Sequence, residues 1–355
     1  MKEVFPDFTW DEISNLLRST AEPGKWWGDT EITHTASQQG AGTIHVWNAY
    51  NSGTRFAETT VVVGATSRPV EKNITFTNTL GRSKTFEITH IPAGLVQRTP
   101  YPDLEVVDWR VYGFPSKPIY AEVDFKSPTT VTLKPGESTS VSIVVTPPSG
   151  LDPDTIPQYS GYIRFVSGRD VYNVPYQGLT YNISDIPVLE RDILPNLPQL
   201  PAMAKWDESA GDYEFVDEDI VTYNTAAGEE PNIVFFARQP SYNQRIDLVA
   251  ANTTFKPTYH GFNSSSDLNT TTPKLPIVDD FGGAESFGQI YSVLYEMPLY
   301  REIAWWGGLD NEEGEPELVP EGDYRFLLRV LPVKSDAEDP DDWESWLGPV
   351  IRIVS

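Results

Sequence analysis

Residues 139–147 read TSVSIVVTP, and this stretch decides how the rest of the chain is interpreted. Val141, Ile143 and Val145 alternate with Ser140, Ser142 and Val144, so one face of the segment is apolar and the other is largely hydroxylic. A period of two is the signature of a β-strand that is buried on one side. Such a strand needs a second sheet to cover its apolar face, and a β-sandwich is therefore expected.

The same alternation recurs on both sides of this stretch. Strand-like runs separated by turn signals are 59–64, 72–78, 84–90, 121–125, 129–133, 160–167 and 170–176. Short strands at this spacing are typical of an antiparallel sandwich, which we place at residues 57–184. We expect Ile163 and Phe165 to face inward, and Tyr162 and Arg164 to face the opposite side. Pro175 predicts an edge or a strand end.

One predicted core unites the apolar faces of these strands. It joins two strands of an early hairpin to the two later ones, and comprises Ile74, Phe76, Phe86, Ile88, Val141, Ile143, Val145, Ile163 and Phe165.

A second β-rich region follows after four prolines. Residues 185–206 carry Pro187, Pro195, Pro198 and Pro201 and are expected to form a semi-rigid linker. Further strand-like runs indicate a second β-sandwich at 207–355; they are 232–239, 244–252, 288–297, 322–333 and 349–355. The polar stretch 262–274 is expected to be an exposed loop.

The first fifty residues have a different pattern. Thr9 and Glu12 have capping-box spacing, and an apolar stripe of Trp10, Ile13, Leu16 and Leu17 predicts a helix. The stripe must either be exposed or pack on the neighbouring sandwich. A QQGAG turn at 38–42 then leads into an apolar element over 44–50, and its glycines are expected to have backbone angles costly for other residues or to allow close packing.

Composition limits the function classes. The net charge of −25 argues against nucleic acid as a partner, and no apolar run is long enough for a membrane span. The chain has no cysteine, so disulfides and thiolate metal sites are excluded. Five N-x-[ST] sequons favour secretion and are glycosylation candidates: Asn73, Asn182, Asn252, Asn263 and Asn269. Because no signal peptide accompanies them, we expect the chain to lack its true N-terminus.

The order of these motifs resembles the subtilisin-like serine proteases (subtilases) of the cell-envelope type. Residues 5–21, FPDFTWDEISNLLRSTA, resemble the segment that follows the catalytic serine helix, and Gln39, Gly40 and Gly42 match the family's QGAG turn. Residues 159–165, YSGYIRF, resemble a strand of the fibronectin type III-like domain of that family. A second such strand is matched by Val174, Pro175, Tyr176 and Gly178, and residues 319–331 resemble a strand of a further sandwich domain.

The resemblance implies a mainly β chain. Two tandem antiparallel β-sandwich domains of fibronectin type III/Ig-like type, at 57–184 and 207–355, would follow a short helical remnant of an α/β subtilase domain at 1–56. The implied partners are the missing N-terminal subtilase domain and the polypeptide substrate of the parent endopeptidase.

The subtilase triad motifs D-[ST]-G, H-G-[TS] and G-T-S-x-[AS]-x-P are absent, so no catalytic residue is assigned and the chain is predicted to be inactive alone. Ser67 and His260 lie in superficially similar settings but are interpreted as loop or structural residues. No cofactor-binding or metal site is assigned. The acidic runs 310–323 and 336–344 would suit calcium by residue type, although solvated loop charge is the favoured interpretation.

Two alternatives remain open. In the first alternative, the chain is a secreted adhesion or carbohydrate-binding protein. Its exposed tryptophans would then form a sugar-stacking platform instead of filling a sandwich core; they are Trp305, Trp306, Trp343 and Trp346. In the second alternative, the chain is the product of an incomplete gene model and has no independent function. The sequence does not specify peptide specificity or oligomeric state.

Overall fold

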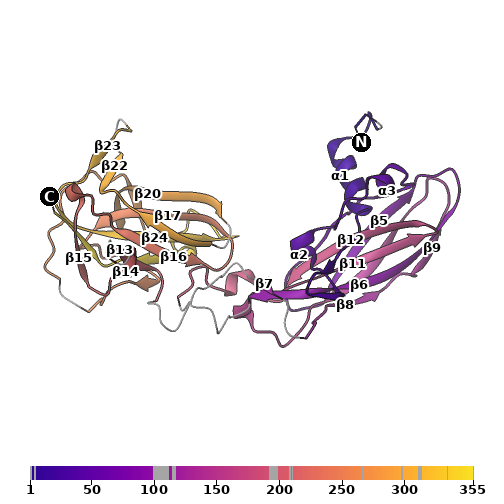
Figure 1. The fold of residues 1–355 in the computed structure, drawn as a ribbon, viewed down its shortest axis with the longest axis horizontal. Helices are drawn as coiled ribbons and strands as arrows, with labels where there is room; N and C mark the ends of the chain where they lie inside the picture. Colours follow the sequence, from indigo (N-terminus) through magenta and orange to yellow (C-terminus); the bar gives the residue numbers. More distant parts are fainter. Residues whose placement is uncertain are drawn as a thin grey trace. The chain divides into compact units, whose positions relative to one another are not determined.

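The structure is a computed structural model. It describes residues 2–3, 5–98, 112–113, 117–191, 199–207, 209, 211–265, 268–296, 299–310, 314–333 and 335–354. The described chain is mainly β and divides into two compact units between Ile186 and Pro187 (Figure 1).

The first unit is a β-sandwich of two sheets. One sheet runs in the order β6–β11–β12–β4, with β9 also paired to β6; the strands are β4 (Val61–Ala65), β6 (Lys84–Arg98), β9 (Thr130–Leu133), β11 (Gln158–Ser167) and β12 (Asp170–Leu179). The facing sheet runs β3–β5–β10–β8, with β3 (Thr54–Phe56), β5 (Val70–Asn78), β8 (Glu122–Phe125) and β10 (Ser138–Thr146). Three short strands extend the first sheet beside β6: β1 (Lys25–Trp26), β2 (Asp29–Thr33) and β7 (Tyr112–Gly113).

The sandwich core contains all nine side chains expected from the sequence. Val141, Ile143 and Val145 on β10 are fully buried, as are Ile163 and Phe165 on β11. The predicted early hairpin is wrong, however. β5 pairs with β10 in register Ile74↔Val141, whereas β6 pairs with β11 in the other sheet, so their apolar faces meet across the core instead of lying in one sheet.

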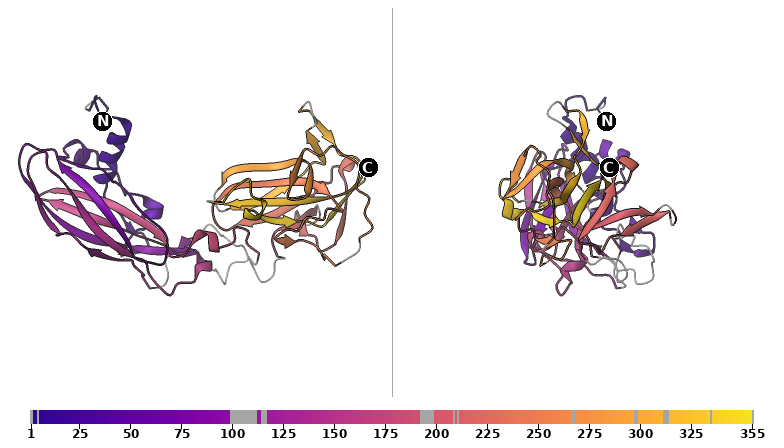
Figure 2. Two further views of the ribbon diagram at one scale, coloured as in Figure 1. Left: turned by 180° about the vertical axis from the view of Figure 1, so that it is seen from behind. Right: turned by 90° about the vertical axis from the view of Figure 1, so that its left-hand side faces the viewer.

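The N-terminal segment lies on the outer side of the β11–β12 sheet (Figures 1 and 2). It contains α1 (Trp10–Ser19), α2 (Ala36–Gln39) and α3 (Val46–Tyr50). α1 begins with the predicted capping box: the Glu12 amide donates to the Thr9 hydroxyl at 3.1 Å, and the Glu12 carboxylate accepts from the Thr9 amide at 2.7 Å. None of the helices in the described ranges is long and apolar enough to cross a membrane.

The apolar stripe of α1 is divided between the two environments foreseen for it. Ile13 and Leu16 are buried, but Trp10 is 72% exposed. Trp10 is the first residue of the helix, and α1 contacts β12 and β3 with its other face. The stripe therefore packs on the sandwich through Ile13 and Leu16 and is exposed at Trp10.

The second unit also has two main sheets. The smaller runs β14–β13–β16–β21, with β13 (Ala202–Asp207), β14 (Asp212–Phe215), β16 (Asn232–Ala237) and β21 (Leu299–Ala304). The larger follows the order β15–β26–β24–β17–β20–β19; its strands are β15 (Ile220–Asn224), β17 (Ser241–Ala250), β19 (Asp279–Phe281), β20 (Ala284–Glu296), β24 (Gly322–Pro332) and β26 (Val350–Val354). β18 (Tyr259–His260) and β25 (Glu344–Leu347) attach beside β24, and β22 (Gly308–Asp310) pairs with β23 (Pro316–Leu318). Phe235 of β16 and Phe326 of β24 belong to the core shared by the two sheets.

The stretch 185–206 is only partly a connector. Leu189 bridges Ala237 of β16, Glu344 holds the Val188 and Leu189 amides, and residues 202–206 begin β13. The linker prediction is wrong for these residues because β16 and Glu344, which are distant in sequence, satisfy their backbone; residues 192–198 lie outside the described ranges. The boundary expected after residue 56 falls at the end of β3, whose Phe56 packs against Phe76 and Phe165 in the sandwich core.

The predicted loop at 262–274 is irregular, and its Asn263 and Asn269 are exposed. It is nevertheless anchored. The Thr271 amide donates to the Asp323 carboxylate at 2.6 Å, and Arg352 pairs with the same carboxylate at 2.7 Å.

Candidate functional site

The residues of the QGAG turn join separate parts of the N-terminal segment. The side-chain oxygen of Gln39 accepts from the Gly24 amide at 2.9 Å, and its amide nitrogen donates to the His34 carbonyl at 2.7 Å. Gly40 ends α2 with φ 61°, and Gly42 has φ 108°. A Cβ on Gly42 would lie 2.3 Å from the Glu22 carbonyl oxygen. Both glycines thus have the backbone angles expected from the sequence, and Gly42 also allows a close backbone approach.

The strand motifs make a reciprocal pairing of tyrosine and glycine inside the sandwich. In the β11–β12 register, Tyr159 lies opposite Gly178 and Gly161 lies opposite Tyr176. A Cβ on Gly161 would be 2.4 Å from the Tyr176 hydroxyl oxygen, and one on Gly178 would be 2.4 Å from the Tyr159 hydroxyl oxygen. Each glycine leaves room for the ring on the facing strand. The physical reason for both motifs is therefore core packing.

Val174 and Pro175 have similarly structural positions. Val174 is fully buried in the core. Pro175 faces Tyr162 of β11 and lies just before the residues of β12 that pair with β4, which begin at Tyr176. The proline therefore lies where β12 is paired with β11 and its pairing with β4 has not yet begun, as expected from its missing N–H.

Buried polar contacts fasten the N-terminal segment to the outer face of this sheet. The Ser160 hydroxyl, fully buried, accepts from the Ala36 amide at 2.9 Å and shares a hydrogen bond with the Thr35 hydroxyl at 2.9 Å. The Tyr162 hydroxyl donates to the Gly40 carbonyl at 2.9 Å. Tyr162 was expected on the outward face, and it lies there, but it is fully buried against Ala36 of α2 and Ala93 of β6. Desolvation by burial raises the pKa of Tyr162, so its hydroxyl stays a donor.

The other end of the segment is held by the same two strands. The Asn173 side chain donates to the Ala21 carbonyl at 2.9 Å, and Arg164 forms an ion pair with Glu22. The Thr59 hydroxyl donates to Asn15 of α1 at 3.0 Å. We call this set of contacts the docking face. Because its polar groups are mutually paired and mostly buried, the segment has one defined position on the sandwich.

The N-terminal segment also exposes large apolar side chains on its helices and the turn before α3. These residues are called the apolar set, and their exposed fractions are Tyr50 46%, Val46 55%, Ile44 59%, Trp47 69% and Trp10 72%. Trp47 and Tyr50 stack with ring centroids 5.9 Å apart, and Phe5 lies 6.3 Å from Tyr50. α1 and α3 are in contact. An accumulation of this kind on one segment is typical of a surface that another protein part covers.

The two catalytic look-alikes belong to different units of the chain. Ser67 lies between β4 and β5, and His260 lies in β18 of the second unit. His90 is a core-edge residue: its Nε2 is 2.8 Å from the Tyr176 hydroxyl, and burial lowers its pKa to about 4. Within the described ranges, no three His, Asp or Glu side chains are grouped to hold a metal ion.

The acidic run 336–344 is occupied by local turns. Asp339 accepts from the Asp341 amide at 3.0 Å, and Asp336 accepts from the Glu338 amide at 3.0 Å. Glu344 accepts from the Leu189 amide at 2.9 Å. The carboxylates between Asp336 and Asp342 are exposed, in agreement with solvated loop charge, whereas Glu344 is half-buried and binds backbone amides. Part of the run 310–323 lies outside the described residues.

The tryptophans considered as a sugar platform are mostly internal. Trp305, Trp343 and Trp346 are at most 9% exposed, and only Trp306 is open, at 44%. The Trp305 ring packs edge-on against Phe326 at 5.4 Å. The core-filling interpretation is therefore confirmed for three of the four.

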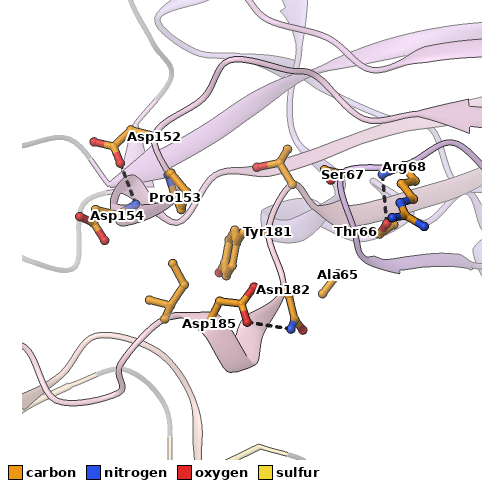
Figure 3. A pocket seen from close by; sticks show the side chains of 12 residues that line it. Ala65, Thr66, Ser67, Arg68, Asp152, Pro153, Asp154, Tyr181, Asn182 and Asp185 are labelled. Carbon is orange, nitrogen blue, oxygen red and sulfur yellow. Dashed lines mark hydrogen bonds between the residues drawn. The ribbon is translucent and has the colours of Figure 1, made fainter.

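All five candidate glycosylation asparagines have exposed side chains; they are Asn73, Asn182, Asn252, Asn263 and Asn269. Asn182 lies at the edge of a cavity of about 560 Å³ at one end of the first unit (Figure 3). The alternation of apolar and polar residues in the sequence does not identify this cavity, because its walls come from three turns that are separate in the chain.

Comparison with known proteins supports a β-sandwich in the first unit. Residues 61–177 match the model of an Fn3-like domain. No curated protein matches the chain.

Solved structures show only a distant likeness. A chaperone–tip adhesin complex of CFA/I fimbriae biogenesis is 8% identical, with 84% of this chain and 99% of that chain covered, at a TM-score of 0.27. The CsuC–CsuE pre-assembly complex of Acinetobacter baumannii Csu pili is 13% identical over 46% of this chain and 86% of that chain, at 0.23. The VesB protease of Vibrio cholerae is 14% identical over 37% and 32%, at 0.20. At TM-scores this low, the likeness carries no weight for function.

Proposed function

We propose that this chain is the non-catalytic C-terminal region of a subtilisin-like serine endopeptidase. In this proposal the segment expected at residues 1–56, up to the start of β3, belongs to the parent's protease domain, and the Fn3-like sandwich is a rigid appendage fastened to it. The parent would hydrolyse peptide bonds with a Ser-His-Asp triad outside this chain, and the chain itself would position the sandwiches beside the active site.

The docking face is the observation that carries the proposal. Motif residues of the protease-like segment bind motif residues of the sandwich directly, as in the contact from the Tyr162 hydroxyl to the Gly40 carbonyl. The buried Ser160 hydroxyl adds two contacts to α2. A buried polar contact stabilises one geometry strongly because breaking it leaves an unsatisfied group. A sandwich held in this way would have a fixed orientation with respect to whatever the N-terminal segment belongs to.

The exposure of the apolar set supports the same proposal. α1 covers the sandwich with Ile13 and Leu16 while Trp10 remains exposed, and Trp47 of α3 is exposed to a similar extent. Full burial of such side chains is worth roughly 1.5–3 kcal/mol each. In the parent, the remainder of the α/β protease domain would cover them.

Secretion of the parent is part of the proposal. Five exposed sequons and the absence of cysteine are compatible with an extracellular glycoprotein that does not depend on disulfides. The adhesion or carbohydrate-binding alternative is not favoured, because Trp305, Trp343 and Trp346 are buried.

The test is the coding sequence upstream of the Met1 codon. We expect the mature transcript, mapped from its 5′ end, to continue the reading frame upstream and to encode G-T-S-x-[AS]-x-P close to Met1. An in-frame stop codon directly upstream, with a start at Met1, would contradict the proposal. The purified chain is expected neither to hydrolyse casein nor to react with a serine-directed fluorophosphonate; labelling of Ser67 would contradict the assignment of catalysis to another segment.

A further inference from the structure

The cavity beside Asn182 is built from three turns at one end of the sandwich (Figure 3). Residues 65–68 leave β4 on one side, the 3-10 turn η1 (Pro153–Thr155) forms another, and residues 180–186 with the 3-10 turn η2 (Ile183–Asp185) form the third. The volume of about 560 Å³ lies within the range of about 300–1,000 Å³ typical of small-molecule sites.

The walls of the cavity are held in place by buried side chains. Ile156 ends η1 in the left-handed region at φ 51°, which is costly for a β-branched residue. It is only 2% exposed and packs with Tyr181 and Ile186. The Thr66 amide donates to the Leu179 carbonyl at 3.1 Å, which joins the first wall to the third. The cavity is therefore preformed.

The chemistry of the lining suits a sugar. Figure 3 shows the Tyr181 ring between the Asp152–Asp154 turn and Asn182, with Thr66, Ser67 and Arg68 across the opening. Hydroxyl and guanidinium groups can donate to sugar oxygens, and carboxylates can accept from sugar hydroxyls.

Asn182 heads the sequon Asn182-Ile183-Ser184, and both Asn182 and Ser184 are exposed. We infer that Asn182 carries an N-linked glycan whose first N-acetylglucosamine occupies this cavity. The inference rests on the proposed route of secretion, which would bring the chain to the glycosylation machinery.

The covalent step is ordinary oligosaccharyl transfer from a lipid pyrophosphate donor. The Nδ2 of Asn182 forms a bond to C1 of the first sugar, the bond from C1 to the pyrophosphate oxygen breaks, the lipid pyrophosphate leaves with the electron pair, and Nδ2 loses one proton. The Asn182 side chain donates to Asp185 at 3.1 Å. Because a glycosylated amide keeps one N–H, this contact can persist and direct the first sugar along the cavity wall.

Asn73 offers a matched control within the same unit. It is exposed on β5, where it lies opposite Ser142 in the open outer face of the β3–β5–β10–β8 sheet. A glycan at Asn73 would extend into solvent.

The experiment uses the full chain secreted from a eukaryotic host behind a foreign leader, so that delivery does not depend on the native route. The folded protein is treated with peptide N-glycosidase in heavy-oxygen water, and release at each site is followed by peptide mass spectrometry. We expect Asn182 to be occupied and to release its glycan at least about tenfold more slowly than Asn73, equivalent to about 1.4 kcal/mol of protection. R68A, which removes an exposed wall residue, is expected to speed release at Asn182 and leave Asn73 unchanged.

An unoccupied Asn182, equal release rates at the two sites, or slow release that R68A does not change would each overturn the inference. A native protein without glycans would overturn the inference together with the proposed secretion, whereas a native protein glycosylated at other sequons but not at Asn182 would overturn the inference alone.

Discussion

Replacing Ser160 with alanine tests whether the docking face holds the N-terminal segment in place. Ser160 is fully buried, and its hydroxyl accepts a hydrogen bond from the Ala36 amide at 2.9 Å. In S160A the Thr35 hydroxyl still has a hydrogen bond to the Ser37 hydroxyl at 2.9 Å. The group that loses its partner is therefore the Ala36 N–H at the start of α2. A buried donor without a partner costs about 1–3 kcal/mol. The cost should appear as local detachment of α2, because the sandwich core is untouched.

Hydrogen exchange measures this effect directly. Peptides covering 34–43 are expected to exchange roughly 5- to 150-fold faster in S160A, which corresponds to the same free-energy range. Peptides covering 138–146 should not change. S140A is the matched control, because Ser140 makes a similar hydroxyl contact to Thr75 at 2.9 Å but is exposed on the outer face of β10; its effect should stay within about 0.5 kcal/mol. Unchanged exchange in S160A, or an equal effect of S140A on 34–43, would refute the reasoning.

Three further predictions concern stability. F165A removes a fully buried ring that contacts Phe56 and Phe76, and is expected to cost about 3–5 kcal/mol in urea unfolding followed for the first unit; a loss below 1 kcal/mol would speak against a packed core. Burial lowers the pKa of His90 to about 4, so neutral His90 contributes to the free energy of unfolding above the unfolded-state pKa of about 6.5, and this contribution is lost as the pH falls toward 4. H90Q should therefore flatten the dependence of the free energy of unfolding on pH between about 6.5 and about 4. An unaltered pH dependence would contradict this assignment. In E344Q the side-chain NH2 group replaces one carboxylate oxygen and faces the Val188 or the Leu189 amide, which is also a donor. Hydrogen exchange at residues 187–190 should therefore accelerate. E338Q, at an exposed position, should leave it unchanged.

Much of the first sandwich could be predicted from the sequence because burial on one side leaves a period of two. β10 is the clearest case, with Val141, Ile143 and Val145 all inward. The pairing of strands was less accessible. β5 and β6 are neighbours in sequence, which suggests a hairpin, but β5 pairs with β10, which is much further along the chain. A periodicity reports which face is buried and contains no information on the partner strand.

The candidate site shows the same limit. Gly40 and Gly42 could be predicted to need special backbone angles from their residue type alone. The burial of Tyr162 could not, since its cover is α2, which lies more than a hundred residues earlier in the chain. β13 was hidden by the surrounding prolines, and its strand conformation depends on pairing with β16. Nonlocal contacts therefore decide the features that sequence patterns missed.

We propose that this chain is the non-catalytic region of a larger serine endopeptidase, and the native protein allows a direct test. The most direct measurement is the intact mass and active-site labelling of the native protein, immunopurified from its source with an antibody against residues 57–184 and treated with a fluorophosphonate. We expect a labelled polypeptide larger than the 39.8 kDa of this chain, with the label on a serine outside residues 1–355. A native polypeptide whose deglycosylated mass is 39.8 kDa and which carries no label would contradict it.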